Sequence, residues 1–323
     1  MVLTTPLLAL LKEQAPTAEI DVLASPRNAP VVAGDPCVTR VYVARDGKFA
    51  WLRTILQLRS RRYDAIFSGQ AAKHLLEART ASLVARSHTY KVSTWRPKRY
   101  QGLFTTVARI PPSATHTVQR LLHLGRHAFG IRAAGADGLG DRYTVRIARD
   151  PRADAMVDAF LSERGPRPFV LVNVSAHFAV RDWAPDRCAE VLRLFLARHP
   201  ELDVVVTRAP GKEAQGAATV RLAARPRVVL APALPVLGVA ALVRRSVAVI
   251  SVDTALVHIA SACDRPVLAL YAPVVPADVT LWRPLSTHSR VLASPLRRSV
   301  GDIPPQDITA AADGLLAAMA ARA

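Results

Sequence analysis

The stretch Val247-Ala-Val-Ile-Ser-Val-Asp-Thr-Ala-Leu-Val-His258 decides the fold that we expect for this sequence. It opens with a Val- and Ile-rich run typical of a buried strand, and after Thr254 its apolar residues recur at helical spacing. Asp253 or Thr254 is therefore predicted to cap a helix at the carboxyl edge of a parallel sheet, where free N–H groups can bind a diphosphate. His258 lies one helical turn further on and is predicted to face the same side. The alternative interpretation is a capped helix with a partly buried histidine.

The same alternation of short apolar runs and amphipathic stretches continues along the whole chain and predicts βα units on parallel sheets. With 323 residues, the chain is long enough for two such domains, joined by a Gly-rich linker over residues 130–142. In the first half we expect strands near residues 20–24, 38–43, 65–68 and 89–93, and helices over 49–62, 72–85 and 113–129. In the second half we expect strands over 168–174, 202–207, 227–230, 247–251 and 267–271, and a final helix over 305–323.

The chain has a formal net charge of +18, and its basic residues are concentrated in the first half. Between Arg79 and Arg132 there are ten Lys or Arg residues and no Asp or Glu. Such a field attracts polyanions, whether nucleic acid, an anionic lipid surface or an acidic glycolipid. A solvated basic face without a partner gives the same pattern, so charge alone does not choose between these interpretations.

Cysteine usage and hydropathy indicate a cytoplasmic protein. Cys37, Cys188 and Cys263 are far apart and in no zinc-binding spacing, so we expect all three to be small buried residues of a reducing compartment. The first residues lack a signal-peptide pattern, and the most apolar window, residues 228–243, contains two prolines and is too short to span a membrane. Dinucleotide-binding, P-loop, nucleophile-elbow and HExxH motifs are missing from the sequence, which leaves the Asp253-Thr254 segment to indicate the chemistry.

Residues 251–258, followed by 265–271 and Pro276, resemble the donor-site signature of glycosyltransferase family 9, the lipopolysaccharide heptosyltransferases. Further matches to the family pattern follow in order along the chain, at residues 18–28, 63–70, 116–120, 173–185 and 207–213. The resemblance implies an α/β fold of GT-B type, with two Rossmann-like domains facing each other across a cleft. Residues 1–140 would bind the acceptor and residues 141–323 the nucleotide-sugar, and the last helix would be able to pack back on the N-terminal domain.

The resemblance also implies site residues and a reaction. The implied reaction is an inverting, metal-independent transfer of a sugar, heptose in the best-known members, from ADP-heptose to the lipopolysaccharide core, with no other cofactor. The partners would be this donor and an acidic glycolipid, with peripheral contact at the inner membrane surface. We expect a monomer that does not bind nucleic acid. The implied donor-binding residues are Asp253, Thr254, His258, Arg181, Ser175 and Glu213. The implied acceptor-binding residues are Gln70, Lys73, Arg96 and Arg120.

The sequence departs from the family pattern in several places. Family members usually begin with a strand and a Gly-Asp loop directly before the stretch that corresponds to residues 2–8, and this loop carries the Asp assigned as general base. Either the start of the sequence is placed too late or the protein is a truncated relative, and we favour the first, because a doubly wound sheet without a middle strand leaves backbone groups unpaired. The catalytic Asp is then expected upstream of Met1, and no catalytic residue is assigned within the chain. Ser68, Ala255 and the pair Val274-Val275 replace Asp, Gly and polar residues of the pattern. Added side-chain atoms at a glycine position narrow a phosphate site.

Two other functions stay open at the level of sequence. The replaced positions suit a catalytically impaired paralogue that binds a nucleotide-sugar or a glycan without transfer. The basic stretch over residues 79–132 suggests nucleic-acid binding, although the chain has no recognisable DNA- or RNA-binding motif.

Overall fold

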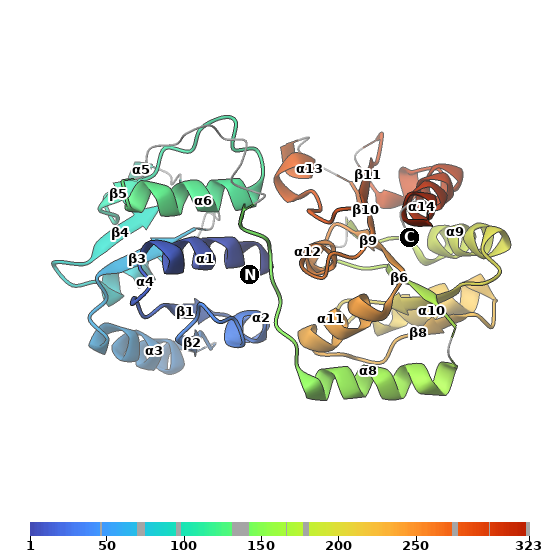
Figure 1. The fold of residues 1–323 in the computed structure, drawn as a ribbon, viewed down its shortest axis with the longest axis horizontal. Helices are drawn as coiled ribbons and strands as arrows, with labels where there is room; N and C mark the ends of the chain where they lie inside the picture. Colours follow the sequence, from blue (N-terminus) through green and yellow to red (C-terminus); the bar gives the residue numbers. More distant parts are fainter. Residues whose placement is uncertain are drawn as a thin grey trace. The chain divides into compact units, whose positions relative to one another are not determined.

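The computed structural model describes residues 1–45, 47–69, 75–94, 98–130, 142–165, 167–176, 181–272, 277–296 and 298–320. The chain divides into two compact units, Leu3–Arg146 and Ile147–Ala323 (Figure 1). Each unit alternates strands and helices, and every strand pair among the described residues is parallel. The predicted α/β class with parallel sheets is confirmed.

The N-terminal unit contains two small sheets, β1-β2 and β3-β4-β5. Its helices α1 and α6 pack against each other, and their close approach depends on Gly125. A Cβ atom at Gly125 would lie 2.7 Å from Cδ2 of Leu10 and 2.8 Å from Cδ1 of Leu7. The strands are β1 (Asp21–Ala24), β2 (Arg40–Val43), β3 (Ala65–Ser68), β4 (Tyr90–Ser93) and β5 (Thr106–Val107). The helices are α1 (Thr5–Gln14), α2 (Ala29–Ala33), α3 (Lys48–Ser60), α4 (Leu75–Val84), α5 (Lys98–Gln101) and α6 (Thr117–Ala128).

The C-terminal unit is built on one six-stranded sheet with the strand order β11-β10-β9-β6-β7-β8. This is the order of a Rossmann fold, in which the direction of strand addition reverses between the two central strands, here β6 and β9. The strands are β6 (Phe169–Asn173), β7 (Asp203–Thr207), β8 (Val228–Leu230), β9 (Ala248–Val252), β10 (Val267–Tyr271) and β11 (Ser289–Ala293). The helices are α8 (Pro151–Arg164), α9 (Pro185–Arg198), α10 (Glu213–Ala223), α11 (Val236–Arg245), α12 (Ala255–Ala262), α13 (Ala277–Trp282) and α14 (Pro305–Ala320).

The core of the C-terminal unit lies on both faces of its sheet. Strands β6, β7, β9 and β10 are buried at every position, as expected for parallel strands covered by helices on both sides. Helices α9, α10 and α14 contribute to the main core on one face. On the other face, Val257 of α12 packs against Ala269 and Tyr271 of β10. The last helix, α14, contacts α9, β10 and β11.

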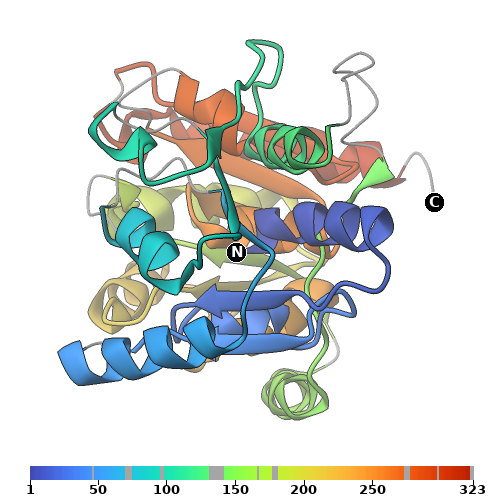
Figure 2. The same cartoon turned by 90° about the vertical axis from the view of Figure 1, so that its left-hand side faces the viewer.

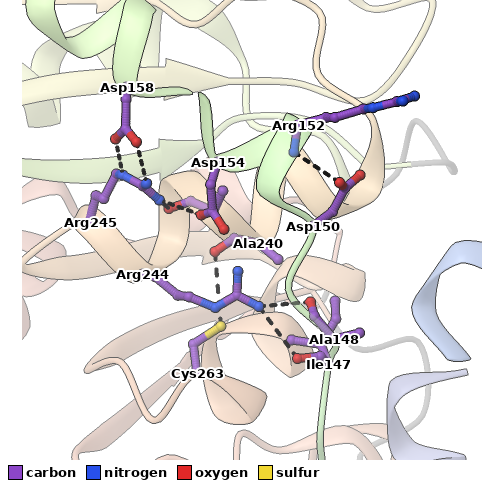
Figure 3. Close-up of polar contacts among 11 residues, drawn as sticks. Ile147, Ala148, Asp150, Arg152, Asp154, Asp158, Ala240, Arg244, Arg245 and Cys263 are labelled. Carbon is purple, nitrogen blue, oxygen red and sulfur yellow. Dashed lines mark hydrogen bonds and ion pairs between the residues drawn. The ribbon is translucent and has the colours of Figure 1, made fainter. Parts of the chain in front are cut away.

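Two adjacent arginines at the end of α11 hold the beginning of the C-terminal unit (Figure 3). Arg245 Nη1 donates a hydrogen bond to Asp154 Oδ1 of α8 over 2.8 Å, and its Nη2 donates to Asp158 Oδ2 over 2.8 Å. The hydrogen bond from the guanidinium holds the pKa of the Asp154 carboxyl below its usual range. Arg244 Nη2 donates to the carbonyl oxygen of Ala148 over 2.9 Å. The segment that leads into α8 is therefore fixed to α11 through its backbone, and α8 itself through two side chains.

Most predicted elements are confirmed, and the differences have local causes. The helix expected over 113–129 begins only at Thr117, because His116 and Gln119 form a capping box. Strands β5 and β11 and helices α1, α2, α5 and α8 are not predicted. β5 has two residues and β11 is half-buried to exposed, so neither shows the apolar run of a buried strand.

The environment of the cysteines corrects one expectation. Cys188 is buried, whereas Cys37 and Cys263 are only half-buried, so the prediction that all three are buried is wrong. The pKa of the Cys188 thiol is raised by its burial. Within the described ranges, no helix combines the length and the hydrophobicity that crossing a bilayer requires.

Candidate functional site

The segment singled out from the sequence lies where the sheet of the C-terminal unit reverses its strand order. β6 and β9 are neighbours there, and Asn173 at the end of β6 pairs in register with Ser251 of β9. The helices that follow these two strands, α9 and α12, pack on opposite faces of the sheet. The carboxyl ends of β6 and β9 therefore form the switch point of the sheet, which is the place where open α/β sheets bind their ligands.

Thr254 caps α12, as predicted. Its Oγ1 accepts a hydrogen bond from the backbone N–H of Leu256 over 3.2 Å. Asn173 Nδ2 donates to Thr254 Oγ1 and to Ser251 Oγ, over 3.1 Å in each case. The amide at the end of β6 thus fixes the cap of the helix that follows β9, where the first-turn N–H groups give a positive end. Asn173 is not among the predicted site residues, although a polar residue that ends a buried strand is a signal for one.

Arg181 and Asp253 form an ion pair at the same edge of the sheet. Arg181 Nη1 lies 2.9 Å from Asp253 Oδ2, and the two side chains are 33% and 11% exposed. The guanidinium is therefore partly accessible, and its planar fork of donors matches the geometry of a phosphate. The structure thus brings together three predicted donor-binding residues, Arg181, Asp253 and Thr254. His258 is half-buried in α12, with its ring centroid 6.1 Å from that of Trp282, and its contact with a donor stays a prediction.

A second cation lies on the loop that follows β7. Lys212 Nζ is 2.7 Å from Asp182 Oδ2, and Asp182 Oδ1 accepts a hydrogen bond from the N–H of Ala176 over 2.8 Å. Because Asp182 directly follows Arg181, this pair connects the loop after β6 with the loop after β7. Neither Asp182 nor Lys212 is a predicted site residue. A lysine beside a glycine at the carboxyl end of a buried strand is the signal that could have found Lys212.

Ser175 and Glu213 shape these loops. Ser175 is 1% exposed, and its Oγ accepts a hydrogen bond from the N–H of Ala209 over 2.8 Å. Glu213 Oε1 accepts a hydrogen bond from the N–H of Gly211 over 3.1 Å, and backbone hydrogen bonds hold the pKa of its carboxyl below the usual range. Gly211 has a φ of 80°, in the left-handed region that favours glycine. Direct contact of Ser175 or Glu213 with a donor stays a prediction.

The acceptor-binding prediction is mostly outside the part of the chain that the structure describes. Gln70, Lys73 and Arg96 lie outside the described residues, and their roles stay predictions. Arg120 is described: its Nε donates a hydrogen bond to the carbonyl oxygen of Ala114 over 3.1 Å. This contact holds the turn that precedes α6, and a role of Arg120 in acceptor binding stays a prediction.

Comparison with known proteins assigns the chain to a family. Residues 51–300 match glycosyltransferase family 9 (heptosyltransferase). The chain belongs to this family. This glycosyltransferase is 26% identical to lipopolysaccharide heptosyltransferase 3 of Escherichia coli (strain K12), over 98% of its own length and 94% of the relative. A second Escherichia coli protein of the same name is 25% identical, over 89% of this chain and 84% of the relative.

Solved structures of the family have the same fold. The family 9 glycosyltransferase of Veillonella parvula DSM 2008 superposes with a TM-score of 0.80 at 16% identity, covering 98% of this chain and 93% of that one. E. coli ADP-heptose lps heptosyltransferase II superposes with a TM-score of 0.77 at 21% identity, and the match covers 99% of this chain and 96% of that one. The predicted GT-B type, with two Rossmann-like units in one chain, is confirmed.

Proposed function

We propose that this glycosyltransferase moves a heptose from ADP-heptose to an acidic acceptor of the lipopolysaccharide core, with inversion at the anomeric carbon. The observation that carries the proposal is the capped start of α12 at the switch point of the sheet, with Arg181 beside it. A helix N-terminus and a guanidinium together suit a diphosphate. In support, an E. coli heptosyltransferase of the same fold has been solved with ADP, at a TM-score of 0.71 and 19% identity.

The chemistry assigns distinct roles to the groups of the site. The acceptor hydroxyl attacks the anomeric carbon, the bond from this carbon to the diphosphate oxygen breaks, and a carboxylate takes the hydroxyl proton. Arg181, Lys212 and the first-turn N–H groups of α12 stabilise the negative charge on the departing diphosphate. Asp253 orients Arg181 through their ion pair. A carboxylate acts as the general base of this step, and no described residue is assigned to it.

The acceptor side of the proposal rests on charge. The region from Arg79 to Arg132 contains ten basic residues and no acidic residue, and it belongs to the N-terminal unit. Such a field attracts an acceptor that carries phosphates and acidic sugars. Because such an acceptor is a glycolipid, the enzyme works in peripheral contact with a membrane. The names of the Escherichia coli relatives, lipopolysaccharide heptosyltransferases, agree with this acceptor class.

Calorimetric titration with ADP tests the donor site. The wild-type chain should bind ADP, and Arg181→Gln should weaken binding about 10- to 100-fold, because a charge-assisted contact contributes about 1.5–3 kcal/mol. Arg187→Gln is the matched control, since Arg187 lies on α9, is 41% exposed and pairs with Glu190. An unchanged dissociation constant in Arg181→Gln, or no binding of ADP to the wild type, contradicts the proposal.

Turnover separates an enzyme from a paralogue that only binds. Release of ADP from ADP-heptose should depend on the acceptor and should persist in EDTA, because cationic side chains take the place of a divalent ion at the diphosphate. Loss of transfer in EDTA contradicts metal independence. Tight ADP binding without any release of sugar identifies a binding protein instead.

A further inference from the structure

Helix α3 of the N-terminal unit is apolar on two sides. Its inner side packs Ile55 and Leu58 into a small core together with α4. Its outer side carries Phe49, Leu52 and Leu56, which are 89%, 48% and 60% exposed. In Figure 2, α3 lies in blue at the surface of the N-terminal unit.

The outer residues form one continuous stripe, which we call the α3 stripe: Phe49, Leu52 and Leu56. Residues three and seven positions apart lie above one another on a helix, so these side chains share one face. Exposed apolar side chains gathered in one patch indicate a surface that binds a partner.

The α3 stripe is bordered by positive charge. Lys48 and Arg53 lie on the same helix, Arg59 and Arg62 follow at its end, and residues 47–63 contain no Asp or Glu. A helical segment with this composition, aromatic and Leu side chains beside Lys and Arg, is typical of one that lies in the interface of an anionic membrane.

A basic cavity of about 460 Å³ continues the stripe at the end of α3. Arg59 connects the two, because it lies three residues after Leu56 and lines the cavity. Its Nη1 donates hydrogen bonds to the carbonyl oxygens of Leu83 and Ala85, over 2.7 and 3.0 Å, which fixes the guanidinium at the rim. The cavity is lined by Arg59, Arg62, Arg86, Ser87 and His88.

We propose that the α3 stripe and the adjoining basic cavity form the surface by which the enzyme docks on an anionic phospholipid bilayer. Phe49, Leu52 and Leu56 enter the boundary between headgroups and acyl chains, and the arginines of the cavity receive a lipid phosphate. The inference builds on the proposed function in one respect, since a glycolipid acceptor is held in a membrane. It concerns a surface of the N-terminal unit, whereas the residues of the proposed donor site belong to the C-terminal unit.

Charge and chemistry favour a bilayer over other occupants. A second copy of the chain would bring the same cationic border against itself, and like charges repel. A nucleic acid would be held by the arginines and could stack on Phe49, but Leu52 and Leu56 offer it no stacking surface. An anionic bilayer matches both features, because it offers negative headgroups and an apolar interior within a few ångströms of each other.

Sedimentation with lipid vesicles tests the docking surface. The wild-type chain should bind vesicles of phosphatidylcholine mixed with phosphatidylglycerol, and should bind pure phosphatidylcholine far less. The triple variant Phe49→Ser, Leu52→Ser, Leu56→Ser should lower the partition coefficient about 100-fold, because three apolar side chains no longer enter the interface. The double variant Arg53→Ser, Arg62→Asn should lower it about 25-fold at low salt, since each surface charge contributes about a factor of five.

The controls use the C-terminal unit. The triple variant Met156→Ser, Leu222→Ser, Leu296→Ser removes side chains that are 50%, 42% and 55% exposed, and it should leave vesicle binding unchanged. Circular dichroism should show that all variants keep the fold, because only exposed positions are changed. ADP titration of the same variants should give the wild-type dissociation constant, which keeps a failure of the docking surface distinguishable from a failure of the donor site.

Three results would overturn the inference. The first is wild-type binding that does not depend on phosphatidylglycerol. The second is a stripe variant that binds vesicles as well as the wild type. The third is a wild-type dimer in analytical ultracentrifugation that the stripe variant dissociates, without vesicle binding by either, because the stripe would then be an interface between copies of the chain.

Discussion

The two units use the same alternation of strands and helices with different results. In the C-terminal unit, six strands form one sheet, and β6, β7, β9 and β10 are buried at every position. In the N-terminal unit, the described strands form two separate sheets, of two and three strands. Ala24 is the one buried residue in β1, β2 and β3 together.

This difference agrees with the two tasks that we propose for the enzyme, donor binding by the C-terminal unit and acceptor binding by the N-terminal unit. A site that holds a diphosphate against a helix cap needs strand ends in fixed positions, and a continuous buried sheet supplies them. The N-terminal unit has shorter strands with more exposed backbone, and such regions open locally at a lower free-energy cost. We therefore expect the C-terminal unit to be the more stable of the two, and three experiments test this comparison.

The largest effect is expected from one substitution made in both units. Leu171 of β6 is fully buried, so Leu171→Ala should lower the free energy of unfolding of the C-terminal unit by about 3 kcal/mol through lost burial and a cavity. Leu23 of β1 is 37% exposed, so Leu23→Ala should cost less than about 1 kcal/mol. Hydrogen exchange of peptides from each unit, measured against denaturant, gives both values. Equal losses of unfolding free energy would mean that the β1-β2 sheet is as tightly packed as the sheet of the C-terminal unit.

An intermediate effect is expected at the arginine that joins α8 to α11. Arg245→Gln removes hydrogen bonds to Asp154 and Asp158 and should destabilise the C-terminal unit by about 1–2 kcal/mol. The matched change in the N-terminal unit is Arg142→Gln, whose partner is Glu13 and whose side chain is 69% exposed. Arg142→Gln should lower the free energy of unfolding by only a few tenths of a kcal/mol, roughly what an exposed ion pair contributes. Thermal unfolding of Arg245→Gln and Arg142→Gln compares the two losses of stability. An equal loss in the two variants would contradict the expected difference between the units.

The smallest effect is expected in the response to acid. Burial, together with the nearby charge of Arg126, lowers the pKa of His123 in the N-terminal unit below its ordinary value of 6.5. The imidazole of His123 therefore binds a proton more readily in the unfolded chain than in the folded one. The neutral, buried His123 contributes to the free energy of unfolding above pH 6.5, and this contribution is lost as the pH falls toward the folded-state pKa. The carboxyl of Asp154 has a pKa below 3.8, so its contribution is lost only in stronger acid.

The two units should therefore weaken at different pH values. Hydrogen exchange between about pH 7 and pH 5 should show loss of protection in the N-terminal unit before the C-terminal one. In His123→Gln this pH dependence should flatten, while the exchange of peptides from α8 stays as in the wild type. Parallel loss in both units, or an unchanged slope in the variant, would contradict the assignment to His123.

The sequence predicts local features of the molecule well and spatial pairings poorly. Buried parallel strands show as uninterrupted apolar runs, and the Thr254 cap follows from local backbone chemistry, so both are predicted and confirmed. Asn173 and Lys212 become site residues only when the strand order is known, because their neighbours come from distant parts of the chain. β5 lacks a pattern that would identify it in a single sequence. α1 carries one that the prediction did not use, with Pro6 in its first turn and Leu7, Leu8 and Leu11 at helical spacing.

The ion pair between Arg181 and Asp253 has a consequence for the catalytic cycle. The carboxylate of Asp253 is the counter-ion of Arg181. An incoming diphosphate has to compete with a tethered anion of the same protein for this guanidinium, and the carboxylate can return as soon as the nucleotide begins to leave. We expect this competition to limit product inhibition, so that the spent nucleotide departs quickly and the site is ready for the next donor.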